Sequence, residues 1–197
     1  MSRLEGKTAL VTGSVQGIGL AIATALAGAG ARIALHGLAT ADEARDAASS
    51  LRSAGAQDVR FFEADMRDVP SIEAMMADIA KWGGADILVN NAGIQKTVSL
   101  AEADAATWDA ILAVNLSGAF HTMRLALPVM AERGYGRVIN IASVHGLVAS
   151  VNKAPYVASK FGLVGMSKVA ALEYADAGSK RSGGVTVNCI APGWTET

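Results

Sequence analysis

The fold is decided by residues 8–19, Thr8-Ala9-Leu10-Val11-Thr12-Gly13-Ser14-Val15-Gln16-Gly17-Ile18-Gly19, in which a short apolar strand enters a glycine-rich turn and a helix begins inside the turn. Glycines permit such a tight turn and let backbone N–H groups approach a pyrophosphate at the positive end of a helix. The spacing G-x-x-x-G-x-G differs from the commoner dinucleotide pattern G-x-G-x-x-G. By itself it is equally compatible with a glycine-rich turn that binds nothing. The residues predicted to surround a pyrophosphate are Gly13, Ser14, Gln16, Gly17, Ile18 and Gly19.

Beyond this turn, short β-branched or apolar runs alternate with longer Ala-rich segments of helical period, which is typical of strand–helix units over a buried parallel sheet. The predicted strands are 8–11, 32–36, 59–63, 87–90, 137–141 and 185–190. The predicted helices are 17–29, 41–54, 71–82, 104–133 and 155–177, and Pro128 is expected to bend or end the fourth of them early. The predicted fold class is α/β, a doubly wound Rossmann-type parallel sheet in a single domain over residues 1–197.

Length and charge exclude several classes of protein. At 197 residues, 51% of them hydrophobic, the chain can bury one sizeable core. Seventeen basic and eighteen acidic side chains leave a net charge of −1, so no basic excess favours nucleic acid or an anionic membrane surface. The single Cys189 suits a reducing compartment and cannot form a cysteine-rich metal site. With a polar N-terminus and no apolar run of about eighteen residues, a soluble cytoplasmic protein is expected, with no metal, nucleic acid or membrane as partner.

Polar motifs follow the later predicted strands in a fixed order. Asn90-Asn91-Ala92-Gly93 closes the fourth strand, Asn115 lies in the fourth helix, Ser143 follows the fifth strand, and Tyr156-Val157-Ala158-Ser159-Lys160 opens the fifth helix. With the glycine-rich turn, these motifs resemble the short-chain dehydrogenase/reductase family over nearly the whole chain. The resemblance implies an oxidoreductase with a nicotinamide dinucleotide. Further cofactor contacts are then expected at Asp65, Met66, Asn91, Ala92, Gly93, Tyr156, Lys160, Pro192 and Gly193.

Tyr156 and Lys160 are four residues apart, so on a helix they share one face. The pair alone is common, because a packing tyrosine beside a solvated lysine produces it too. In an open parallel sheet, however, ligands bind outside the carboxyl ends of the strands, where the glycine-rich turn, Asn91 and Ser143 would meet the start of this helix. A phenol has an unperturbed pKa of about 10 and needs a neighbouring cation to act as a base near neutrality. Lys160 can supply that cation.

The resemblance implies a role for each catalytic residue. Tyr156 would be the acid/base, and Lys160 would stabilise its anion and bind the nicotinamide ribose. Ser143 would position the substrate oxygen, and Asn115 would hold a proton-relay water. Each role fits the donors and acceptors of its side chain. The hydride chemistry belongs to the nicotinamide, whereas the protein supplies orientation and a proton.

The choice between NAD and NADP depends on the end of the second strand, His36-Gly37-Leu38. Dinucleotide folds commonly place an acid there for the ribose 2′-hydroxyl, or an arginine for a 2′-phosphate. Neither is present, which departs from the family's commonest NAD pattern, and Arg45 is read as a solvated helix charge. Without a cationic site, the sequence favours NAD. Asp65 matches the family position that contacts the adenine amine, or else caps a turn.

Three polar residues near the catalytic motifs bear on the substrate: Gln95, His145 and Lys153. Singly, each is better explained as a loop or surface side chain, but together an amide, an imidazole and an ammonium around one small site suit a carboxylate. Their segments, with Trp194, resemble family members that oxidise (R)-3-hydroxybutyrate to acetoacetate. This implies substrate contacts from Gln95, Ser143, His145, Lys153, Tyr156 and Trp194, with Trp194 against the carbon chain.

Two other functions stay open: a 3-oxoacyl-thioester reductase of the same family that uses NADPH, and a non-catalytic nucleotide-binding protein. The resemblance also implies a homo-oligomer, specifically a tetramer. The last predicted helix has little polar face, so it should be covered on both sides, by the sheet and by a partner subunit or a further helix. Lid helices after Trp194, a further carboxylate-binding glutamine and the last strand of the sheet are expected to be missing from a chain that ends at Thr197.

Overall fold

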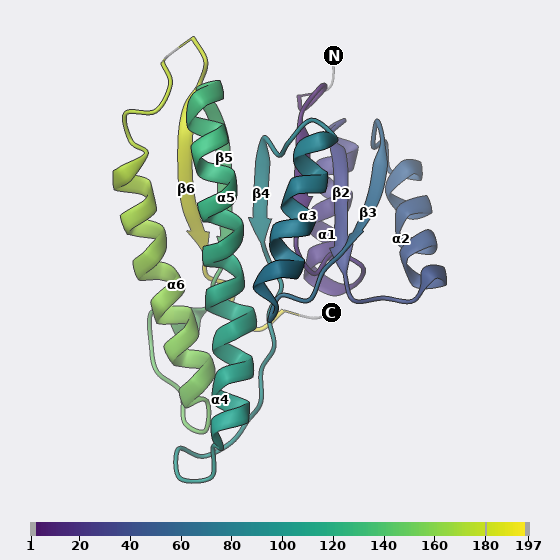
Figure 1. Ribbon diagram of the computed structural model, residues 1–197. Coiled ribbons are helices and arrows are strands. Elements are labelled where there is room, and N and C mark those ends of the chain that lie inside the picture. Colours follow the sequence, from purple (N-terminus) through teal and green to yellow (C-terminus); the bar gives the residue numbers. More distant parts are fainter. Residues whose placement is uncertain (1–2, 180, 196–197) are drawn as a thin grey trace.

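Six strands form one parallel sheet in the order β3-β2-β1-β4-β5-β6 in the computed structural model, which describes residues 3–179 and 181–195 (Figure 1). They are β1 (Thr8–Val11), β2 (Arg32–Gly37), β3 (Val59–Glu63), β4 (Ile87–Asn90), β5 (Tyr135–Ile141) and β6 (Gly184–Ile190). The predicted doubly wound α/β class is confirmed, and no strand bound differs from its prediction by more than two residues. Both ends of the predicted domain, residues 1 and 197, lie outside the described residues.

The helices are α1 (Gly17–Gly28), α2 (Ala41–Ser53), α3 (Val69–Lys81), α4 (Ala105–Leu112), α5 (Gly118–Arg133) and α6 (Ala154–Glu173). A short 3-10 turn, η2 (Val144–Gly146), follows β5. The side chains of Thr40, Asp68 and Asp104 accept N–H groups in the first turns of α2, α3 and α4, so local sequence sets where these helices begin. The last helix ends four residues before the predicted residue 177.

The predicted helix 104–133 is instead three consecutive helical pieces. Between α4 and α5 lies a π-helical turn, η1 (Ala113–Ser117). Pro128 does not end the helix early, because α5 continues to Arg133. Pro128 and the residue four before it, Arg124, are both exposed, so the carbonyl that loses its hydrogen bond faces water. Leu127 and Met130 on the buried side hold the turn against the core.

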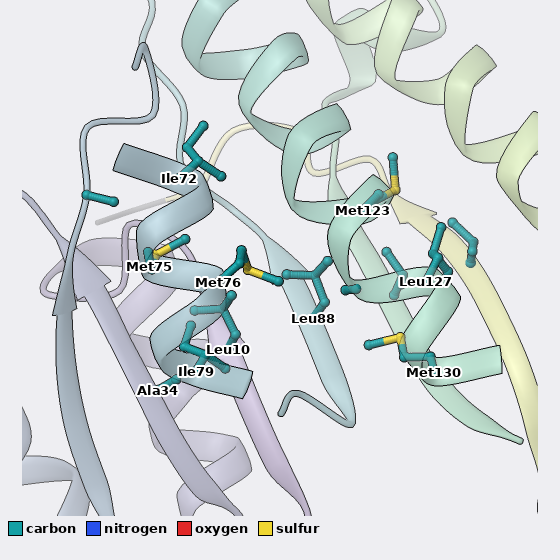
Figure 2. Close-up of a cluster of buried hydrophobic side chains, with 14 of the residues drawn as sticks. Leu10, Ala34, Ile72, Met75, Met76, Ile79, Leu88, Met123, Leu127 and Met130 are labelled. Atoms are coloured by element: carbon teal, nitrogen blue, oxygen red, sulfur yellow. The ribbon is translucent and has the colours of Figure 1, made fainter. Parts of the chain in front are cut away.

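Apolar side chains fill both sides of the sheet. On one side α3, α5 and α6 cover the strands, and Figure 2 shows Ile72 and Ile79 of α3 and Met123 and Met130 of α5 on opposite sides of Leu88. On the other side α1 and α2 contribute small residues, including Ala23, Ala27, Ala47 and Ala48, together with Leu51. Small side chains let these two helices approach the sheet closely, which places the start of α1 directly at the end of β1.

One face of α6 packs on the sheet, and the opposite face is open in the described part of the chain. The apolar side chains Phe161, Val169 and Leu172 are exposed there. Among the described residues, no further helix covers this exposed face of α6, so the alternative of cover by a further helix of the chain is not confirmed there. Cover by a partner subunit stays a prediction.

The segment Ala105–Arg133 is long and apolar enough to span a membrane by length and composition alone. In the fold, however, 44% of its most apolar window is buried. Met123, Leu127 and Met130 pack into the core beside α3. A core helix of a folded domain meets the same criterion, because it too must be apolar on its buried side.

The carboxyl ends of all six strands lie at one edge of the sheet, because every neighbouring pair is parallel. In Figure 1 the arrowheads of β4 and β6 point to this edge, and α4 and the start of α6 extend beyond it. The turns after β1, β4 and β5 therefore lie close to the start of α6, which is the arrangement that a ligand site in this class of fold requires.

Candidate active site

The glycine-rich turn is shaped by glycines that no other residue could replace without strain or overlap. Gly13 and Gly17 have φ values of +62° and +56°, in the left-handed region. A Cβ on Gly19 would overlap the carbonyl oxygen of Gly13 and lie 2.5 Å from Nδ2 of Asn91. The residues of this tightly packed turn form part of the wall of a cavity of about 550 Å³, called here the larger cavity.

The residues that line the larger cavity fit a dinucleotide. Gln16 precedes α1, and its side chain makes no capping hydrogen bond. The first N–H groups of a helix have no partner within the helix, so those of α1 can meet an anion at the positive helix end. Of the predicted pyrophosphate residues, Gly13, Gln16, Gly17, Ile18 and Gly19 line this cavity.

Ser14 is the exception among the predicted pyrophosphate residues. It is 0% exposed and does not line the cavity. Its Oγ accepts the backbone N–H of His36 at 3.0 Å, and its own N–H donates to the carbonyl of His36 at 2.8 Å. The Ser14 hydroxyl is therefore hydrogen-bonded inside the protein, where it holds the turn against β2.

The end of β4 is cross-linked to the same turn. Nδ2 of Asn91 donates to the carbonyls of Thr12 and Gly13, both at 3.0 Å. Oγ1 of Thr12 accepts the N–H groups of Asn91 and Ala92 at 2.9 and 3.0 Å. Asn91, Ala92 and Gly93 all line the larger cavity, as predicted for cofactor contacts. The Asn91 amide group, however, fixes the shape of the turn.

Asp65 and Met66 line the larger cavity in the loop after β3. Asp65 forms an ion pair with Arg67 at 2.6 Å and also accepts the backbone N–H of Arg67 at 2.9 Å. The Arg67 guanidinium and N–H hold the pKa of Asp65 below its usual value. The turn-cap interpretation of Asp65 is thus confirmed, and the predicted adenine contact would have to share a carboxylate that already has partners.

Next to the larger cavity lies a second hollow of about 330 Å³, called here the smaller cavity. The two adjoin each other, because Ile18, Asn91, Gly93 and Ile94 line both. Three of the four predicted catalytic residues line the smaller cavity: Ser143, Tyr156 and Lys160. They come from the loop after β5 and the first turns of α6, which are brought together only by the parallel sheet.

Lys160 lies beneath Tyr156 on the inner face of α6. Its Nζ is 5.6 Å from the centroid of the Tyr156 ring and donates to the carbonyl of Ile141 at 2.8 Å. Only 4% of Lys160 is exposed. Burial lowers the pKa of its ammonium from 10.5 to about 8. An ammonium in this position can stabilise a developing negative charge on the phenol oxygen.

Asn115 lies in the π-helical turn η1 and is fully enclosed. Its Oδ1 accepts the N–H of Ile94 at 2.8 Å, and its Nδ2 donates to the Ile94 carbonyl at 2.9 Å and to Oγ of Ser159 at 3.2 Å. The side chain thereby ties the loop after β4 to α6. Single π turns often occur at functional sites, because they displace one side chain from the regular helical position. The relay water predicted at Asn115 stays a prediction.

Some of the predicted substrate residues line the smaller cavity, and others lie beside it. Gln95 and Trp194 line the smaller cavity, as do the predicted cofactor contacts Pro192 and Gly193, and Trp194 is 100% exposed. His145 and Lys153 do not line it and instead contact residues that do. The His145 ring lies edge-on to Tyr156, with centroids 6.5 Å apart, and Lys153 Nζ is 5.6 Å from the centroid of the Trp194 ring.

The ring of His145 carries an unsatisfied polar atom. Its Nδ1 is buried and has no hydrogen-bond partner among residues 3–179 and 181–195. Buried polar atoms without a partner are uncommon in folded proteins. The unsatisfied atom belongs to the ring that lies edge-on to Tyr156.

Sequence reasoning missed His36, which it treated only as the place where an acid or a base is absent. In the structure Nδ1 of His36 accepts the N–H of Gly13 at 2.9 Å, and the side chain lines the larger cavity. The available signal was its position: in a parallel sheet the end of β2, where His36 lies, is beside the turn that follows β1. Arg67, also in the cavity wall, was missed as well.

A family model described as short chain dehydrogenase matches residues 7–197. The chain belongs to the short-chain dehydrogenase family. It is therefore an oxidoreductase, and the family implies NAD or NADP as cofactor, in agreement with the fit of the larger cavity.

Three relatives of this short-chain dehydrogenase cover nearly all of it. A D-beta-hydroxybutyrate dehydrogenase from Cupriavidus necator is 52% identical over 197 residues, which is 98% of this chain and 72% of the relative. The 3-oxoacyl-[acyl-carrier-protein] reductase FabG of Escherichia coli strain K12 is 40% identical over 194 residues, 98% of this chain and 75% of the relative. A crystal structure of a short-chain alcohol dehydrogenase from Sinorhizobium meliloti 1021 matches with a TM-score of 0.88 and 36% identity. The match covers 98% of this chain and 74% of that chain.

The buried Lys160 of this short-chain dehydrogenase predicts a pH-dependent stability. The unfolded lysine stays protonated up to its ordinary pKa of 10.5, whereas the folded one loses its proton at about 8. Between pH 8 and pH 10.5 the unfolded state therefore binds more protons at Lys160 than the folded state does. The contribution of Lys160 to the free energy of unfolding consequently rises with pH. Below pH 8 the buried ammonium costs up to about 3 kcal/mol.

Lys160→Met is therefore expected to gain stability relative to the wild type at pH 7 and to lose that advantage as the pH rises from 8 to 10.5. Urea unfolding of both proteins without cofactor at several pH values measures the difference. Lys168→Met, at an exposed position of the same helix, is the matched control and should show no such trend. A Lys160→Met difference that is independent of pH would contradict the assignment.

Proposed function

We propose that this protein is an NAD-dependent 3-hydroxybutyrate dehydrogenase that oxidises (R)-3-hydroxybutyrate to acetoacetate. One observation carries the proposal: the smaller cavity, with Ser143, Tyr156 and Lys160 in its wall, adjoins the larger cavity beside the glycine-rich turn. A small substrate and a dinucleotide could thus meet at Tyr156. The 52% identity to the Cupriavidus necator relative supports the choice of substrate.

The residues of this chain supply binding and proton transfer. A bound nicotinamide supplies the hydride-accepting chemistry. Ser143 lies in the loop after β5 and lines the smaller cavity. Its hydroxyl can therefore donate a hydrogen bond to the substrate oxygen. Tyr156 takes the hydroxyl proton as that oxygen becomes a carbonyl, and the nearby Lys160 ammonium stabilises the phenolate before the transfer.

The surroundings of the smaller cavity favour a short carboxylic acid. Gln95 in its wall offers an amide N–H, and Lys153 and His145 flank the cavity through their contacts with Trp194 and Tyr156. A carboxylate accepts strong hydrogen bonds from such donors. A volume of about 330 Å³ suits a four-carbon acid better than a long acyl chain.

The charged side chains near Leu38 favour NAD over NADP. A hollow of about 400 Å³ adjoins the larger cavity at Leu38, and its charged lining residues are the carboxylates Glu43 and Asp46. Thr40 holds the pKa of Glu43 below its usual value, so this carboxylate is ionised. Arg67, the cation in the wall of the larger cavity, is already paired with Asp65. A 2′-phosphate would therefore meet negative charge without a free cation.

Leu38→Arg is expected to shift this preference towards NADP. Leu38 is exposed and lines both hollows, so an arginine there could pair with a 2′-phosphate. The ratio of kcat/KM for NADP to that for NAD should rise at least about tenfold. Steady-state assays with each cofactor measure it, and Leu38→Gln controls for the loss of the apolar side chain. An unchanged ratio in Leu38→Arg would show that the 2′ position lies elsewhere.

The function itself is tested by turnover. The purified protein is assayed with (R)-3-hydroxybutyrate, its (S) enantiomer and the neutral alcohol 2-butanol, each with NAD and with NADP. The (R) acid with NAD should be preferred over 2-butanol by at least about a hundredfold in kcat/KM, because only the acid uses the carboxylate contacts. Equal turnover of acid and alcohol would refute the substrate. Efficient reduction of an acetoacetyl thioester with NADPH would instead favour the reductase activity of the Escherichia coli relative.

We further propose that the protein is a cytoplasmic homo-oligomer, with a hydroxy acid or keto acid as its small-molecule partner. The exposed apolar face of α6, with Phe161, Val169 and Leu172, supports a subunit contact. The net charge of −1 gives no support for nucleic acid or an anionic membrane as a partner. Light scattering after size-exclusion chromatography measures the number of subunits.

A further inference from the structure

His36 connects the two loops that wall the larger cavity. It is the second-last residue of β2 and only 2% exposed. On one side its Nδ1 accepts the N–H of Gly13, at 2.9 Å, in the glycine-rich turn. On the other side its Nε2 lies 3.2 Å from the carbonyl of Ala64, in the loop that leads to Asp65. One imidazole ring thus spans from the turn after β1 to the loop after β3.

The two contacts define the state of the ring. A backbone N–H can only donate, so Nδ1 must be unprotonated, and the ring proton then lies on Nε2, where it can be donated to Ala64. Burial lowers the pKa of His36 to about 4, so the ring is neutral at physiological pH. A neutral ring in one tautomer satisfies both neighbours at once.

The N–H of Gly13 has little freedom to find another partner. Gly13 has a left-handed φ of +62°, and a Cβ built on it would lie 3.0 Å from Cα of Ala92. The turn is thus confined between β4 on one side and His36 on the other. The backbone of His36 adds three hydrogen bonds with Ser14, so β2 and the turn are joined at two successive residues. The imidazole is the only part of this junction that depends on the side chain at position 36.

We propose that His36 is a positioning residue for the dinucleotide: by accepting the Gly13 N–H, it holds the glycine-rich turn in the shape that binds the pyrophosphate, while Ala64 orients its ring. This inference rests on the proposed function, because a dinucleotide must bind in the larger cavity. His36 contributes geometry and no charge. It acts at the end of β2, the region where related dinucleotide folds carry an acid or an arginine that contacts the ribose directly.

Two substitutions separate the two contacts of the ring. Asparagine carries Oδ1 at the same number of bonds from Cβ as Nδ1 of histidine, so His36→Asn keeps an acceptor for Gly13 and loses the Ala64 contact. Glutamine reaches as far as Nε2, so His36→Gln keeps a donor for Ala64 and offers no acceptor at Gly13. His36→Leu removes both. His121→Leu, at a half-buried position of α5 that does not line the larger cavity, is the matched control.

The readout is the Kd for NADH, measured by fluorescence titration. His36→Asn and His121→Leu are expected to stay within about threefold of the wild type, whereas His36→Gln and His36→Leu bind at least about tenfold more weakly. The KM for the cofactor should rise more in His36→Gln than kcat falls. Thermal unfolding verifies that each variant is folded. If His36→Leu fails to fold, the comparison of asparagine with glutamine decides.

A second readout uses the wild-type protein without cofactor. Nitrogen-15 NMR of the imidazole should show the proton on Nε2 and an unprotonated Nδ1 at neutral pH. A proton on Nδ1 overturns the proposal, as does equal NADH affinity in the asparagine and glutamine variants. If the wild type binds neither NADH nor NADPH, the proposed function fails and the role of His36 fails with it. Wild-type binding with indistinguishable variants removes the role of His36 alone.

Discussion

Tyr156→Phe is expected to lower kcat for (R)-3-hydroxybutyrate oxidation by about 10²- to 10⁴-fold, the range that loss of a general acid/base produces. The substitution removes one hydroxyl from the wall of the smaller cavity and keeps the ring, so its edge-on contact with His145 should persist. The Kd for NADH should change little, because the glycine-rich turn is untouched. A loss confined to kcat would show that the phenol acts in the reaction itself.

Tyr174→Phe is the matched control for this experiment. Tyr174 follows the carboxyl end of the same helix and packs against the main core, far along α6 from the cavity. Its variant should retain wild-type kcat. If Tyr156→Phe also kept its turnover, the non-catalytic alternative would gain and the proposed chemistry at Tyr156 would have to be abandoned.

Gly19→Ala is expected to weaken NADH binding by at least about a hundredfold and to destabilise the fold by about 1–3 kcal/mol or more, the usual cost of overpacking a rigid site. The added Cβ would overlap the carbonyl oxygen of Gly13 and lie 2.5 Å from Nδ2 of Asn91. The first of these is backbone, which cannot rotate away. The turn must therefore open, and it can no longer present its N–H groups to a pyrophosphate.

Gly28→Ala, at the other end of α1, provides the control. A Cβ there meets only the Ala54 carbonyl at 3.5 Å, an ordinary contact. Because alanine is the better helix former, this variant should be as stable as the wild type or more so, with unchanged NADH affinity. Urea unfolding and fluorescence titration measure both variants. Similar affinities for NADH in Gly19→Ala and Gly28→Ala would show that the turn does not hold the dinucleotide.

Much of the fold is predictable from the sequence because its signals are local. The apolar runs of β1 and β4 are fully buried, as parallel strands require. Side-chain caps at Thr40, Asp68 and Asp104 are readable by residue type alone. The π turn at Asn115 is different, because it depends on hydrogen bonds to Ile94 and Ser159 from other parts of the chain.

In the candidate site, too, relations between residues close in sequence could be predicted, and relations between distant residues could not. Tyr156 and Lys160 are correctly expected on one helix face, since a spacing of four fixes that relation. Ser14, by contrast, reads as a phosphate contact but is buried against His36. Pro128 reads as a helix end but is tolerated at an exposed position. For Ser14 the deciding neighbour, His36, lies on another element, whereas for Pro128 the deciding factor is exposure to water.

By itself, the sequence determined the alternation of strands and helices, the glycine-rich turn and the placement of Tyr156 and Lys160 on one helix face, because each depends on residues within a few positions of one another. Only the tertiary structure decided that the cavity lined by Tyr156 adjoins the cavity at the glycine-rich turn and that His36 bridges Gly13 and Ala64. Those relations arise between strands that are distant in sequence, where a parallel sheet brings side chains together that no local pattern connects.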